Sequence, residues 1–287
     1  MTSKFDPRLT PARPDLAADF LQGKLEAKAF VAGQANRVKQ PLAGLYAAAD
    51  EQTQLQTELL FGEEFVVYER KNNWVWGQAS RDGFVGYVRA DALAVGLPKP
   101  DHWVCALRTP LYQWPDLKAP VSGFLHQNSL VAVLGQDDHY VDTGAGWVHV
   151  GDIKPDGDWR ADFVQTALDY LHAPYVWGGR SSIGLDCSAL VQNALMAAGL
   201  PCLRDSDMQE ANLGAPVQLA DDLSNLRRGD LLFWKGHVGL MVDAKTLLHA
   251  NAHHMATAAE PVAGAIARIK KTAGPVQSVR RFKAVKE

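Results

Sequence analysis

The chain has 287 residues, of which 47% are hydrophobic and 21% charged, a balance that excludes a disordered or collagen-like chain. At about 150 residues per domain this length predicts two domains, or three where small barrels occur. The formal net charge is −3 and the sequence pI is about 6.3. Because this balance does not indicate a polyanionic partner, we expect neither nucleic acid nor a membrane surface among the partners.

Residues 1–30 mix charged residues with proline and glutamine and lack the apolar stretch that a signal peptide needs. No segment reaches the roughly 18 consecutive apolar residues of a membrane span. The three cysteines, Cys105, Cys187 and Cys202, are an odd number for a long chain, which favours free thiols in a reducing compartment. These features predict a soluble cytoplasmic protein, and they leave its oligomeric state open.

The residue composition of the first half of the chain changes at about residue 39. Residues 1–38 predict an N-terminal arm with a helix-compatible piece at about 16–28. Residues 39–97 and 98–154 contain short β-branched and aromatic runs between Gly, Asp and Asn, which is typical of small β-barrels. Both segments resemble bacterial Src-homology-3 (SH3) modules in spacing and aromatic placement, so we expect two small SH3-like barrels.

A weak internal repeat supports two barrels, because three motifs recur 60 to 66 residues later in the chain. They are Leu45-Tyr46 with Leu111-Tyr112, Phe65-Val66-Val67 with Leu130-Val131-Ala132, and Gly86-Tyr87-Val88 with Gly146-Trp147-Val148. Two copies are too few for a solenoid, which needs three or more repeats.

Residues 155–287 change to helical periodicity and then to short apolar runs. Apolar side chains at 163, 164, 167, 168 and 171 lie on one face of a helix that Pro174 must end. A second helix is expected to start at Asp186 or Cys187 and to end before Gly199. Helices followed by antiparallel strands predict an α+β domain. The expected strands are at residues 231–234, 237–242, 246–250 and about 276–282.

Cys187 is expected in the first turn of that second helix, directly after a glycine-containing turn. Unpaired N–H groups and the positive end of the helix dipole favour a thiolate there, and the same groups can stabilise an oxyanion. The thiolate is the reactive form of cysteine. Most free cysteines are instead small buried apolar residues, and we keep that interpretation for Cys105 and Cys202.

A nucleophilic thiol needs a base that a third polar group holds in one orientation. His237 is expected to begin a strand, and His249 to lie on the next strand across a turn at residues 243–245, so pairing can bring the two rings together. Surface histidines and a metal site are the competing interpretations. His253 and His254 would point to opposite faces of an extended chain, so we expect no metal and no cofactor.

These residues lie within a series of motifs in residues 160–282. The motifs are Pro174-Tyr175-Val176-Trp177-Gly178-Gly179-Arg180, Gly184-Leu185-Asp186-Cys187-Ser188, Arg204-Asp205-Ser206 with Gln209, Gly229-Asp230-Leu231-Leu232-Phe233-Trp234, His237-Val238-Gly239 and His249-Ala250. In order and spacing they resemble those of the NlpC-type cysteine endopeptidases. The resemblance implies an α+β fold with a papain-like NlpC-type catalytic domain, preceded by the two SH3-like barrels.

The resemblance also implies roles for single residues. Cys187 matches the nucleophile of the family, His237 its general base and acid, and His249 its third polar residue. Tyr175 matches a tyrosine whose hydroxyl points toward the cysteine and helps to hold the oxyanion.

Asp186 and Ser188 flank the nucleophile, and in family members with SH3-type barrels these positions hold the free amino group of the substrate. A carboxylate that pairs with an ammonium discriminates strongly against a blocked amine. The neighbouring motif formed by Arg204, Asp205 and Ser206 is expected to take part in substrate binding as well.

In the same branch of the family an acidic and an aromatic side chain from the first barrel narrow the substrate pocket. Glu63 or Glu64 is the candidate acid, and Tyr87 or Phe84 is the candidate aromatic residue. The competing interpretation is that a loop glutamate is simply solvated, as most are.

The resemblance implies hydrolysis of the γ-D-glutamyl-L-diamino-acid bond, with diaminopimelate or lysine as the diamino acid, in peptidoglycan-derived peptides during cell-wall recycling. Murein tripeptides and tetrapeptides with a free N-terminal L-alanine are the expected substrates. Two alternatives stay open: a Cys-His amidase or acyltransferase on another amide or ester, and a non-catalytic protein that binds cell-wall peptides. A pure binding protein would need none of Cys187, His237 and His249.

Overall fold

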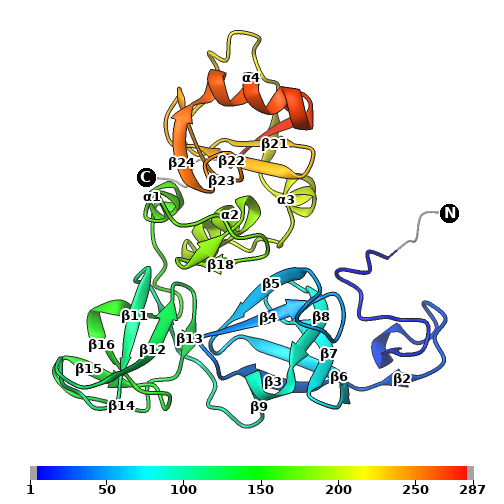
Figure 1. The fold of residues 1–287 in the computed structure, drawn as a ribbon, viewed down its shortest axis with the longest axis vertical. Coiled ribbons are helices and arrows are strands. Elements are labelled where there is room, and N and C mark those ends of the chain that lie inside the picture. Colours follow the sequence, from blue (N-terminus) through cyan, green and yellow to red (C-terminus); the bar gives the residue numbers. More distant parts are fainter. Residues whose placement is uncertain (1–4, 283–287) are drawn as a thin grey trace. The chain divides into compact units, whose positions relative to one another are not determined.

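The computed structural model describes residues 5–282, so residues 1–4 of the predicted arm and residues 283–287 of the predicted catalytic domain lie outside the described residues. The chain divides into two units, Met1–Asp156 and Gly157–Glu287, here called the N-terminal and the C-terminal unit (Figure 1). Among the helices of residues 5–282, none has both the length and the hydropathy of a membrane span.

Residues 5–31 fold as turns and two short strands and not as the predicted helix at 16–28. The elements of this segment are β1 (Ala17–Ala18), the 3-10 turn η1 (Asp19–Leu21) and β2 (Phe30–Val31). β1 and β2 pair in parallel. Gly23 has a φ of +77°, a conformation that ends a helix. The apolar side chains form a small cluster instead of one helical face, so the helix prediction is wrong.

Seven strands form the first sheet of the N-terminal unit. Their spatial order is β5 (Leu55–Leu60), β4 (Leu42–Tyr46), β8 (Val85–Arg89), β7 (Trp74–Ala79), β6 (Glu64–Lys71), β3 (Gln34–Val38) and β9 (Leu93–Ala94). Buried and partly exposed residues alternate along β4 and β8, as expected of strands with one face on a core. β3 lies in the segment that the sequence assigns to the arm, so the strands of this sheet begin earlier than predicted.

A second set of strands follows the first. One sheet has the order β12 (Val121–His126), β11 (Arg108–Tyr112), β16 (Trp147–His149), β15 (Tyr140–Asp142) and β14 (Gly135–Gln136), and another has the order β13 (Leu130–Val131), β10 (His102–Val104) and β17 (Ile153–Pro155). The order β12-β11-β16-β15-β14 corresponds strand by strand to β5-β4-β8-β7-β6. A register shift at Leu45/Tyr46 recurs at Leu111/Tyr112. The 3-10 turns after β8 and β16 are η2 (Ala90–Ala92) and η3 (Val150–Asp152).

The two sets of strands meet at Phe61 and Gly62. Phe61 packs into the apolar core of the second set, and its carbonyl oxygen accepts a hydrogen bond from the Leu130 N–H at 2.8 Å. Gly62 has a φ of +78°, and a Cβ atom at this position would lie 1.9 Å from the Leu130 carbonyl oxygen. Only glycine combines this backbone conformation with so close a contact.

We predict that Gly62→Ala destabilises the N-terminal unit by about 2 kcal/mol beyond the strain of φ alone, because the new methyl group forces two backbones apart. Gly96→Ala is the matched control, since Gly96 has a φ of +77° with open space where a Cβ atom would lie. Its expected cost is the conformational one, about 1 kcal/mol. Urea unfolding of both variants measures the difference, and equal losses of stability would contradict the steric argument.

Four helices and a six-stranded sheet make up most of the C-terminal unit as far as residue 282, where the described residues end. The helices are α1 (Phe163–Leu168), α2 (Cys187–Ala197), α3 (Ser206–Asn212) and α4 (Val262–Ala273). The sheet has the order β20 (Ala215–Val217), β25 (Ser278–Arg281), β21 (Leu231–Trp234), β22 (His237–Met241), β23 (Thr246–Asn251) and β24 (Ala256–Pro261), and a separate pair consists of β18 (Arg180–Ser181) and β19 (Gly184–Leu185). The paired strands of the six-stranded sheet are antiparallel, which agrees with the predicted α+β arrangement.

The four predicted strands of this unit are present, each within two residues of its predicted ends. The first helix is shorter than predicted, because it ends at Leu168 and does not reach residue 171. His172 has a φ of +69°, so the chain has left the helical conformation before Pro174. The sequence analysis missed β24 and α4, because the alanine-rich residues 256–266 show neither a clear strand period nor a clear helix period.

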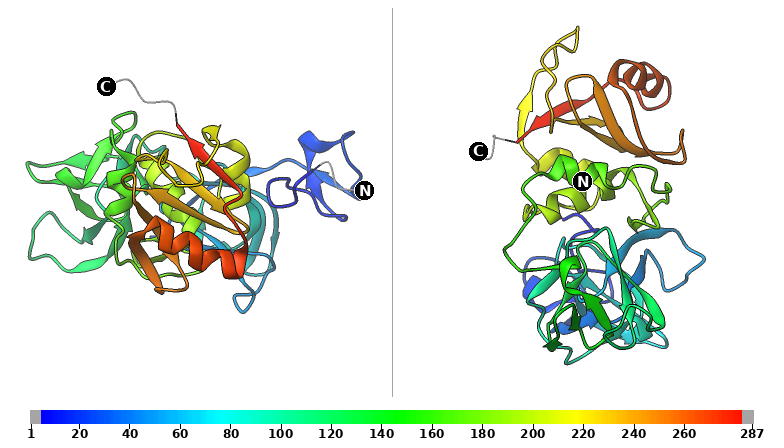
Figure 2. Two further views of the ribbon diagram at one scale, coloured as in Figure 1. Left: turned by 90° about the horizontal axis from the view of Figure 1, so that it is seen from above. Right: turned by 90° about the vertical axis from the view of Figure 1, so that its left-hand side faces the viewer.

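α2 is buried along its whole length, from Cys187 to Ala197. It packs on β22 and β23, the strands that carry His237 and His249. α4 packs on another part of the sheet, with Val262 in a cluster of buried residues from β21, β22, β23 and β25. Figures 1 and 2 show the sheet between α2 and α4. The sheet therefore supports the start of α2 on one side and is itself covered by α4 on the other.

Candidate active site

Cys187 is the first residue of α2, as the sequence predicts. Asp186 is the N-cap: its backbone is extended (φ −98°, ψ 179°), and its side chain accepts a hydrogen bond from the Ala189 N–H at 2.9 Å. Aspartate is a preferred N-cap residue, because its carboxylate satisfies N–H groups that the helix leaves unpaired. Cys187 is 7% exposed, so its side chain is largely shielded from solvent.

The Cys187 thiol keeps its proton in this structure, contrary to the thiolate that the sequence predicts. Burial, followed by the negative charge of Asp186, raises the pKa of Cys187 to about 12. The backbone N–H of Val238, the charge of Arg204 and the N–H of Ser188 lower this pKa, but their effects are smaller. The proton therefore has to leave Cys187 during the reaction, and a base has to accept it.

His237 and His249 form the ring pair that the sequence predicts. His237 begins β22, His249 lies in β23, and His237 Nε2 lies 2.8 Å from His249 Nδ1. His249 is fully buried. Burial lowers the pKa of His237 to about 3, with smaller contributions from the charges of His249 and Arg268. His237 is therefore neutral at physiological pH and can accept a proton.

The start of β22 and the loop before β18 both reach Cys187. The N–H of Val238, the residue after His237, lowers the pKa of the Cys187 thiol, which places the start of β22 near this sulfur. Tyr175 donates its backbone N–H to the Met255 carbonyl oxygen at 3.0 Å. Burial raises the pKa of the Tyr175 hydroxyl, and the charge of a Cys187 thiolate raises it further, so this hydroxyl keeps its proton. The start of β22, next to His237, thus acts on the Cys187 thiol, and Cys187 in turn acts on the Tyr175 hydroxyl.

Asp186 and Ser188 are tied to Arg204, a pairing that the sequence analysis did not predict. Arg204 donates hydrogen bonds to both carboxylate oxygens of Asp186, at 2.9 and 2.6 Å, and to the Ser188 hydroxyl at 2.8 Å. The Gly178 N–H adds a hydrogen bond to Asp186 at 2.9 Å. Burial alone would raise the pKa of Asp186, but Arg204 and the N–H groups of Ala189 and Gly178 together outweigh burial and hold this pKa below its ordinary value. The charge predicted to meet a substrate ammonium is therefore already balanced within the protein.

The other two residues of the Arg204 motif lie at the start of α3. Asp205 is its N-cap residue and Ser206 its first residue, and both are partly exposed. Gln209 donates hydrogen bonds from Nε2 to the carbonyl oxygens of Ser188 and Leu203, both at 2.9 Å. α3 is thereby tied to the first turn of α2. The substrate contacts predicted for Asp205 and Ser206 stay predictions.

Two residues that the sequence analysis assigns to the substrate pocket are buried within the N-terminal unit. Glu63 is 1% exposed, and it accepts hydrogen bonds from the Leu60 N–H at 3.0 Å and from Arg81 at 3.3 Å. These contacts hold the turn before β6. Phe84 is 2% exposed and belongs to the apolar core. We therefore no longer assign Glu63 or Phe84 to substrate binding, because burial leaves neither side chain accessible to a ligand.

Glu64 and Tyr87 are more accessible than Glu63 and Phe84. Glu64 accepts hydrogen bonds from Arg37 at 3.3 Å and from the Ser80 hydroxyl at 3.0 Å. The Tyr87 hydroxyl accepts a hydrogen bond from Arg13 at 2.8 Å. The substrate contacts predicted for Glu64 and Tyr87 stay predictions.

Glu260 and Arg268 are candidate functional residues that the sequence analysis missed. His249 Nε2 lies 2.7 Å from Glu260 Oε1. Arg268 donates hydrogen bonds to both carboxylate oxygens of Glu260, the one to Oε2 at 2.6 Å. Glu260 lies on the strand after that of His249, just as His249 lies on the strand after that of His237. A strand prediction at residues 256–261 would have identified it.

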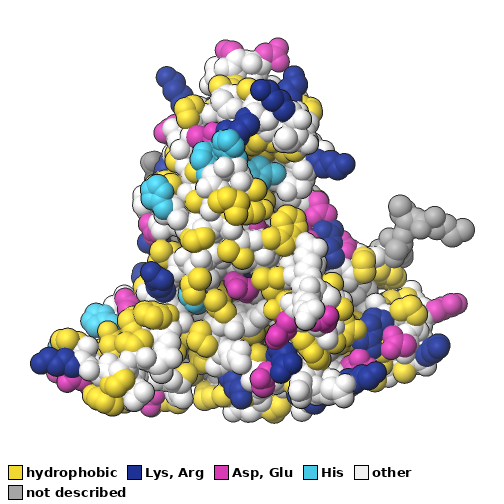
Figure 3. Space-filling view, viewed as in Figure 1, with side chains coloured by type: hydrophobic (Ala, Val, Ile, Leu, Met, Phe, Trp, Pro, Cys, Tyr) yellow, Lys and Arg dark blue, Asp and Glu magenta, His cyan; other side chains and the backbone are white. Residues whose placement is uncertain are grey.

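His254 lies close to the same side chains. His249, His254 and Glu260 each offer one possible ligand atom, and these three atoms lie within 4.8 Å of one another. Figure 3 shows histidine side chains on the surface of this unit. Residues 252–255 form a turn, so the argument that His253 and His254 point to opposite faces of an extended chain is wrong. Both oxygens of Glu260 already accept hydrogen bonds, which a cation would have to displace.

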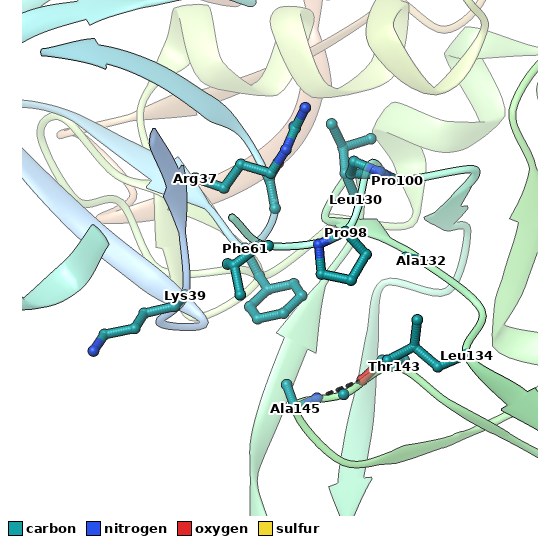
Figure 4. Close-up of a pocket in the computed structure, with 13 residues that line it drawn as sticks. Arg37, Lys39, Phe61, Pro98, Pro100, Leu130, Ala132, Leu134, Thr143 and Ala145 are labelled. Carbon is teal, nitrogen blue, oxygen red and sulfur yellow. Dashed lines mark hydrogen bonds between the residues drawn. The ribbon is translucent and has the colours of Figure 1, made fainter. Parts of the chain in front are cut away.

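A pocket of about 430 Å³ lies in the N-terminal unit, between the two sets of strands (Figure 4). Apolar side chains such as Phe61, Pro98 and Leu130 line it, together with two basic side chains. Within the described part of the chain, its lining contains no cysteine, histidine or carboxylate, so it supplies no nucleophile, acid or base for hydrolysis.

Comparison with known proteins identifies two matching family models. Residues 45–93 match the family described as the bacterial dipeptidyl-peptidase SH3 domain, and residues 172–270 match the NlpC/P60 family. The chain is 27% identical over 235 residues to dipeptidyl-peptidase 6 of Lysinibacillus sphaericus. The aligned region covers 73% of this chain and 85% of that protein. It is 30% identical over 222 residues to the γ-D-glutamyl-L-lysine dipeptidyl-peptidase of Bacillus subtilis. Here the aligned region covers 68% of this chain and 72% of that protein.

A solved structure has a similar fold. An NlpC/P60 family protein of Bacillus cereus matches with a TM-score of 0.72 at 20% sequence identity, over 87% of this chain and 99% of that chain. The papain-like fold and the SH3-like domain in the N-terminal unit agree with the resemblance found in the sequence. The predicted cysteine-type peptidase is confirmed by the same family and by the relatives named as peptidases. The chain belongs to the NlpC/P60 family of cysteine-type peptidases.

Proposed function

We propose that the protein is a γ-D-glutamyl-L-diamino-acid endopeptidase in which Cys187 is the nucleophile, His237 the general base and acid, and His249 the residue that orients His237. The observation that carries this assignment is the 2.8 Å distance between His237 Nε2 and His249 Nδ1, in strands that pack on α2, whose first residue is Cys187. Because His237 Nε2 faces His249, His237 Nδ1 is the ring nitrogen that is left to take the proton of the Cys187 thiol. Nucleophilic catalysis at an amide requires this combination of thiol, neutral imidazole and orienting group.

In the proposed reaction the Cys187 sulfur attacks the γ-carbonyl carbon of D-glutamate while His237 takes the thiol proton. N–H groups at the start of α2 and the Tyr175 hydroxyl stabilise the oxyanion. His237 then donates its proton to the leaving α-amino group of the diamino acid, and a thioester remains on Cys187. Water, deprotonated by His237, hydrolyses the thioester and restores the thiol.

The proposed substrates are peptidoglycan-derived peptides with a free N-terminal L-alanine, such as the murein tripeptides and tetrapeptides of cell-wall recycling. The names of the two relatives support this class, since one is a dipeptidyl-peptidase and the other a γ-D-glutamyl-L-lysine dipeptidyl-peptidase. An enzyme that releases a dipeptide has to recognise the amino terminus, and an ammonium group marks it. Asp186 and Ser188 are its proposed ligands. The Asp186 side chain is 10% exposed, and Arg204 keeps it ionised, so its carboxylate can accept a further hydrogen bond from the ammonium.

We propose further that residues 98–154 form a second SH3-like barrel. The family model covers the first set of strands. The second set repeats its strand order, its register shift and its 3-10 turn. We therefore keep the predicted boundary between the barrels, residues 39–97 and 98–154, apart from the earlier start of the first one at β3.

Mass spectrometry of L-alanyl-γ-D-glutamyl-L-lysine and its diaminopimelate analogue tests the proposed substrate. We expect cleavage of the γ-glutamyl amide, and we expect acetylation of the alanine amine to lower kcat/KM by at least about 100-fold, because a buried charge pair is lost. Cleavage that is indifferent to acetylation would favour an amidase with another specificity. Failure to cleave the unblocked peptides would overturn the substrate assignment.

A further inference from the structure

Glu260 and Arg268 extend the histidine pair by two more residues. We propose that both are positioning residues for the peptidase reaction. Arg268 holds Glu260, and Glu260 fixes the proton on His249 Nε2. His249 in turn fixes the proton on His237 Nε2, so that His237 Nδ1 is free to accept the thiol proton. The inference deepens the proposed function and rests on its assignment of Cys187 and His237.

The strand register brings Glu260 to His249. Leu247 pairs with Glu260 and His249 pairs with Ala258 across β23 and β24, so Glu260 is the diagonal neighbour of His249 on the same face of the sheet. Side chains as long as glutamate reach such a diagonal neighbour. His249 Nε2 and Glu260 Oε1 are 2.7 Å apart, and the Glu260 side chain is 14% exposed.

Arg268 fixes the position and the charge of Glu260. Its guanidinium donates one hydrogen bond to each oxygen of Glu260, a two-point contact that sets the orientation of the carboxylate. Arg268, followed by His249, lowers the pKa of Glu260 to about 2 even though burial opposes this. Glu260 is therefore ionised at neutral pH, and an ionised carboxylate can only accept hydrogen bonds.

The proton positions follow from this carboxylate. His249 Nε2 has to carry a proton in order to donate to Glu260 Oε1. Burial lowers the pKa of His249, so the ring is neutral and its Nδ1 is bare. This bare Nδ1 then accepts a hydrogen bond from His237 Nε2, which must carry the proton of that neutral ring. His237 Nδ1 remains bare, as a base for the thiol has to be.

The same chain of hydrogen bonds matters when His237 becomes charged. A proton taken from Cys187 makes His237 an imidazolium in a partly buried place, and His249 connects it to the negative charge of Glu260. Arg268 itself disfavours that imidazolium, since its charge lowers the pKa of His237. Arg268 therefore has to act through Glu260. The charged and titratable groups that influence the His237 ring are Asp186, His249 and Arg268.

Steady-state kinetics on γ-D-glutamyl peptides separate this role from a general effect of charge. We expect Glu260→Ala and Arg268→Ala to lower kcat by about 10- to 100-fold with KM changed less than twofold, because neither side chain is assigned to the substrate. Lys271→Ala is the matched control, since it removes an exposed cation from the same helix. Its kcat is expected to stay at the native value.

Nitrogen-15 NMR of the histidine rings in the substrate-free protein gives a readout that a merely structural role would not move. A protonated and a bare ring nitrogen differ strongly in chemical shift, so native His237 is expected to show a protonated Nε2 and a bare Nδ1. In Glu260→Ala we expect a mixture of both tautomers. Glu260→Gln keeps the volume and one acceptor oxygen but loses the charge, so it replaces Glu260→Ala if that variant unfolds.

Retention of the native His237 tautomer in both Glu260 variants, or a kcat equal to that of Lys271→Ala, overturns the proposal. In the Glu260→Ala background, Arg268→Ala is expected to cause no further loss of kcat, and an additive loss overturns the role of Arg268 through Glu260. The NMR measurement needs no substrate. Failure to cleave γ-glutamyl peptides would therefore overturn the proposed function, while the ring tautomers would still test this inference.

Discussion

Cys187→Ala is expected to lower kcat/KM for γ-D-glutamyl peptides by about 10⁴-fold or more, because the thioester route depends on this sulfur. The substitution removes one atom from the first turn of α2 and leaves the Asp186 cap in place, so we expect a stability change of no more than about 1 kcal/mol. Mass spectrometry of the peptide products over a long time course measures the residual rate, and thermal unfolding measures the stability.

Cys202→Ala is the matched control for Cys187→Ala. Cys202 is 5% exposed and Cys187 7%, and the Cys202 thiol donates a weak hydrogen bond to the Leu203 carbonyl oxygen. We expect this variant to keep kcat/KM within about twofold of the native value. Native activity in Cys187→Ala, or an equal loss in both variants, would contradict the assignment of Cys187 as nucleophile.

Arg204→Met is expected to destabilise the C-terminal unit by about 3 to 5 kcal/mol, because it leaves the Asp186 carboxylate without its counter-ion. The side chains of Arg204 and Asp186 are 1% and 10% exposed. The N–H groups of Gly178 and Ala189 still donate hydrogen bonds to Asp186, but they do not replace the positive charge. Urea unfolding at pH 7 measures the loss.

Arg228→Met is the control for burial. Arg228 and Asp162 also form an ion pair with an N–O distance of 2.6 Å, but their side chains are 43% and 51% exposed. A pair as exposed as this contributes less than about 1 kcal/mol. Equal losses of stability in Arg204→Met and Arg228→Met would show that burial does not set the strength of the Asp186 pair.

The effect of Arg204→Met on stability has a defined dependence on pH. The pKa of Asp186 is lower in the folded protein than in the unfolded chain, so the ion pair stabilises the fold fully above about pH 4, and this contribution is lost as the pH falls through the folded pKa. In the variant, burial without a counter-ion raises the pKa of Asp186, and the carboxyl group takes up a proton at higher pH. The stability difference should therefore shrink from pH 7 toward pH 4, and growth over that range would contradict the account.

Local signals in the sequence were sufficient to predict much of the C-terminal unit. The apolar runs around the turn at residues 243–245 predict β22 and β23, because turn residues and strand period depend on near neighbours. The geometry of that hairpin then predicts the contact between His237 and His249, which the 2.8 Å distance confirms. The start of α2 at Cys187 follows in the same way from the N-cap preference of Asp186.

Tertiary effects explain what the sequence could not predict. The contact between Arg204 and Asp186 joins residues 18 positions apart, across α2 and the irregular loop that follows it, and no periodicity indicates it. The protonation of Cys187 depends on burial, which outweighs the N–H groups that the helix start supplies. Glu260 was missed because its strand is rich in alanine, which is common in helices and carries little strand signal.

A γ-D-glutamyl peptide with an acyloxymethyl ketone in place of the scissile amide tests most directly whether Cys187 is the nucleophile that His237 and His249 serve. The expected result is one probe per chain, attached to Cys187, with Cys105 and Cys202 unlabelled. Labelling should be lost in Cys187→Ala and slowed strongly in His237→Ala. Equal labelling of the three cysteines, or a Cys187 that stays unlabelled while the protein cleaves its peptide, would contradict the account.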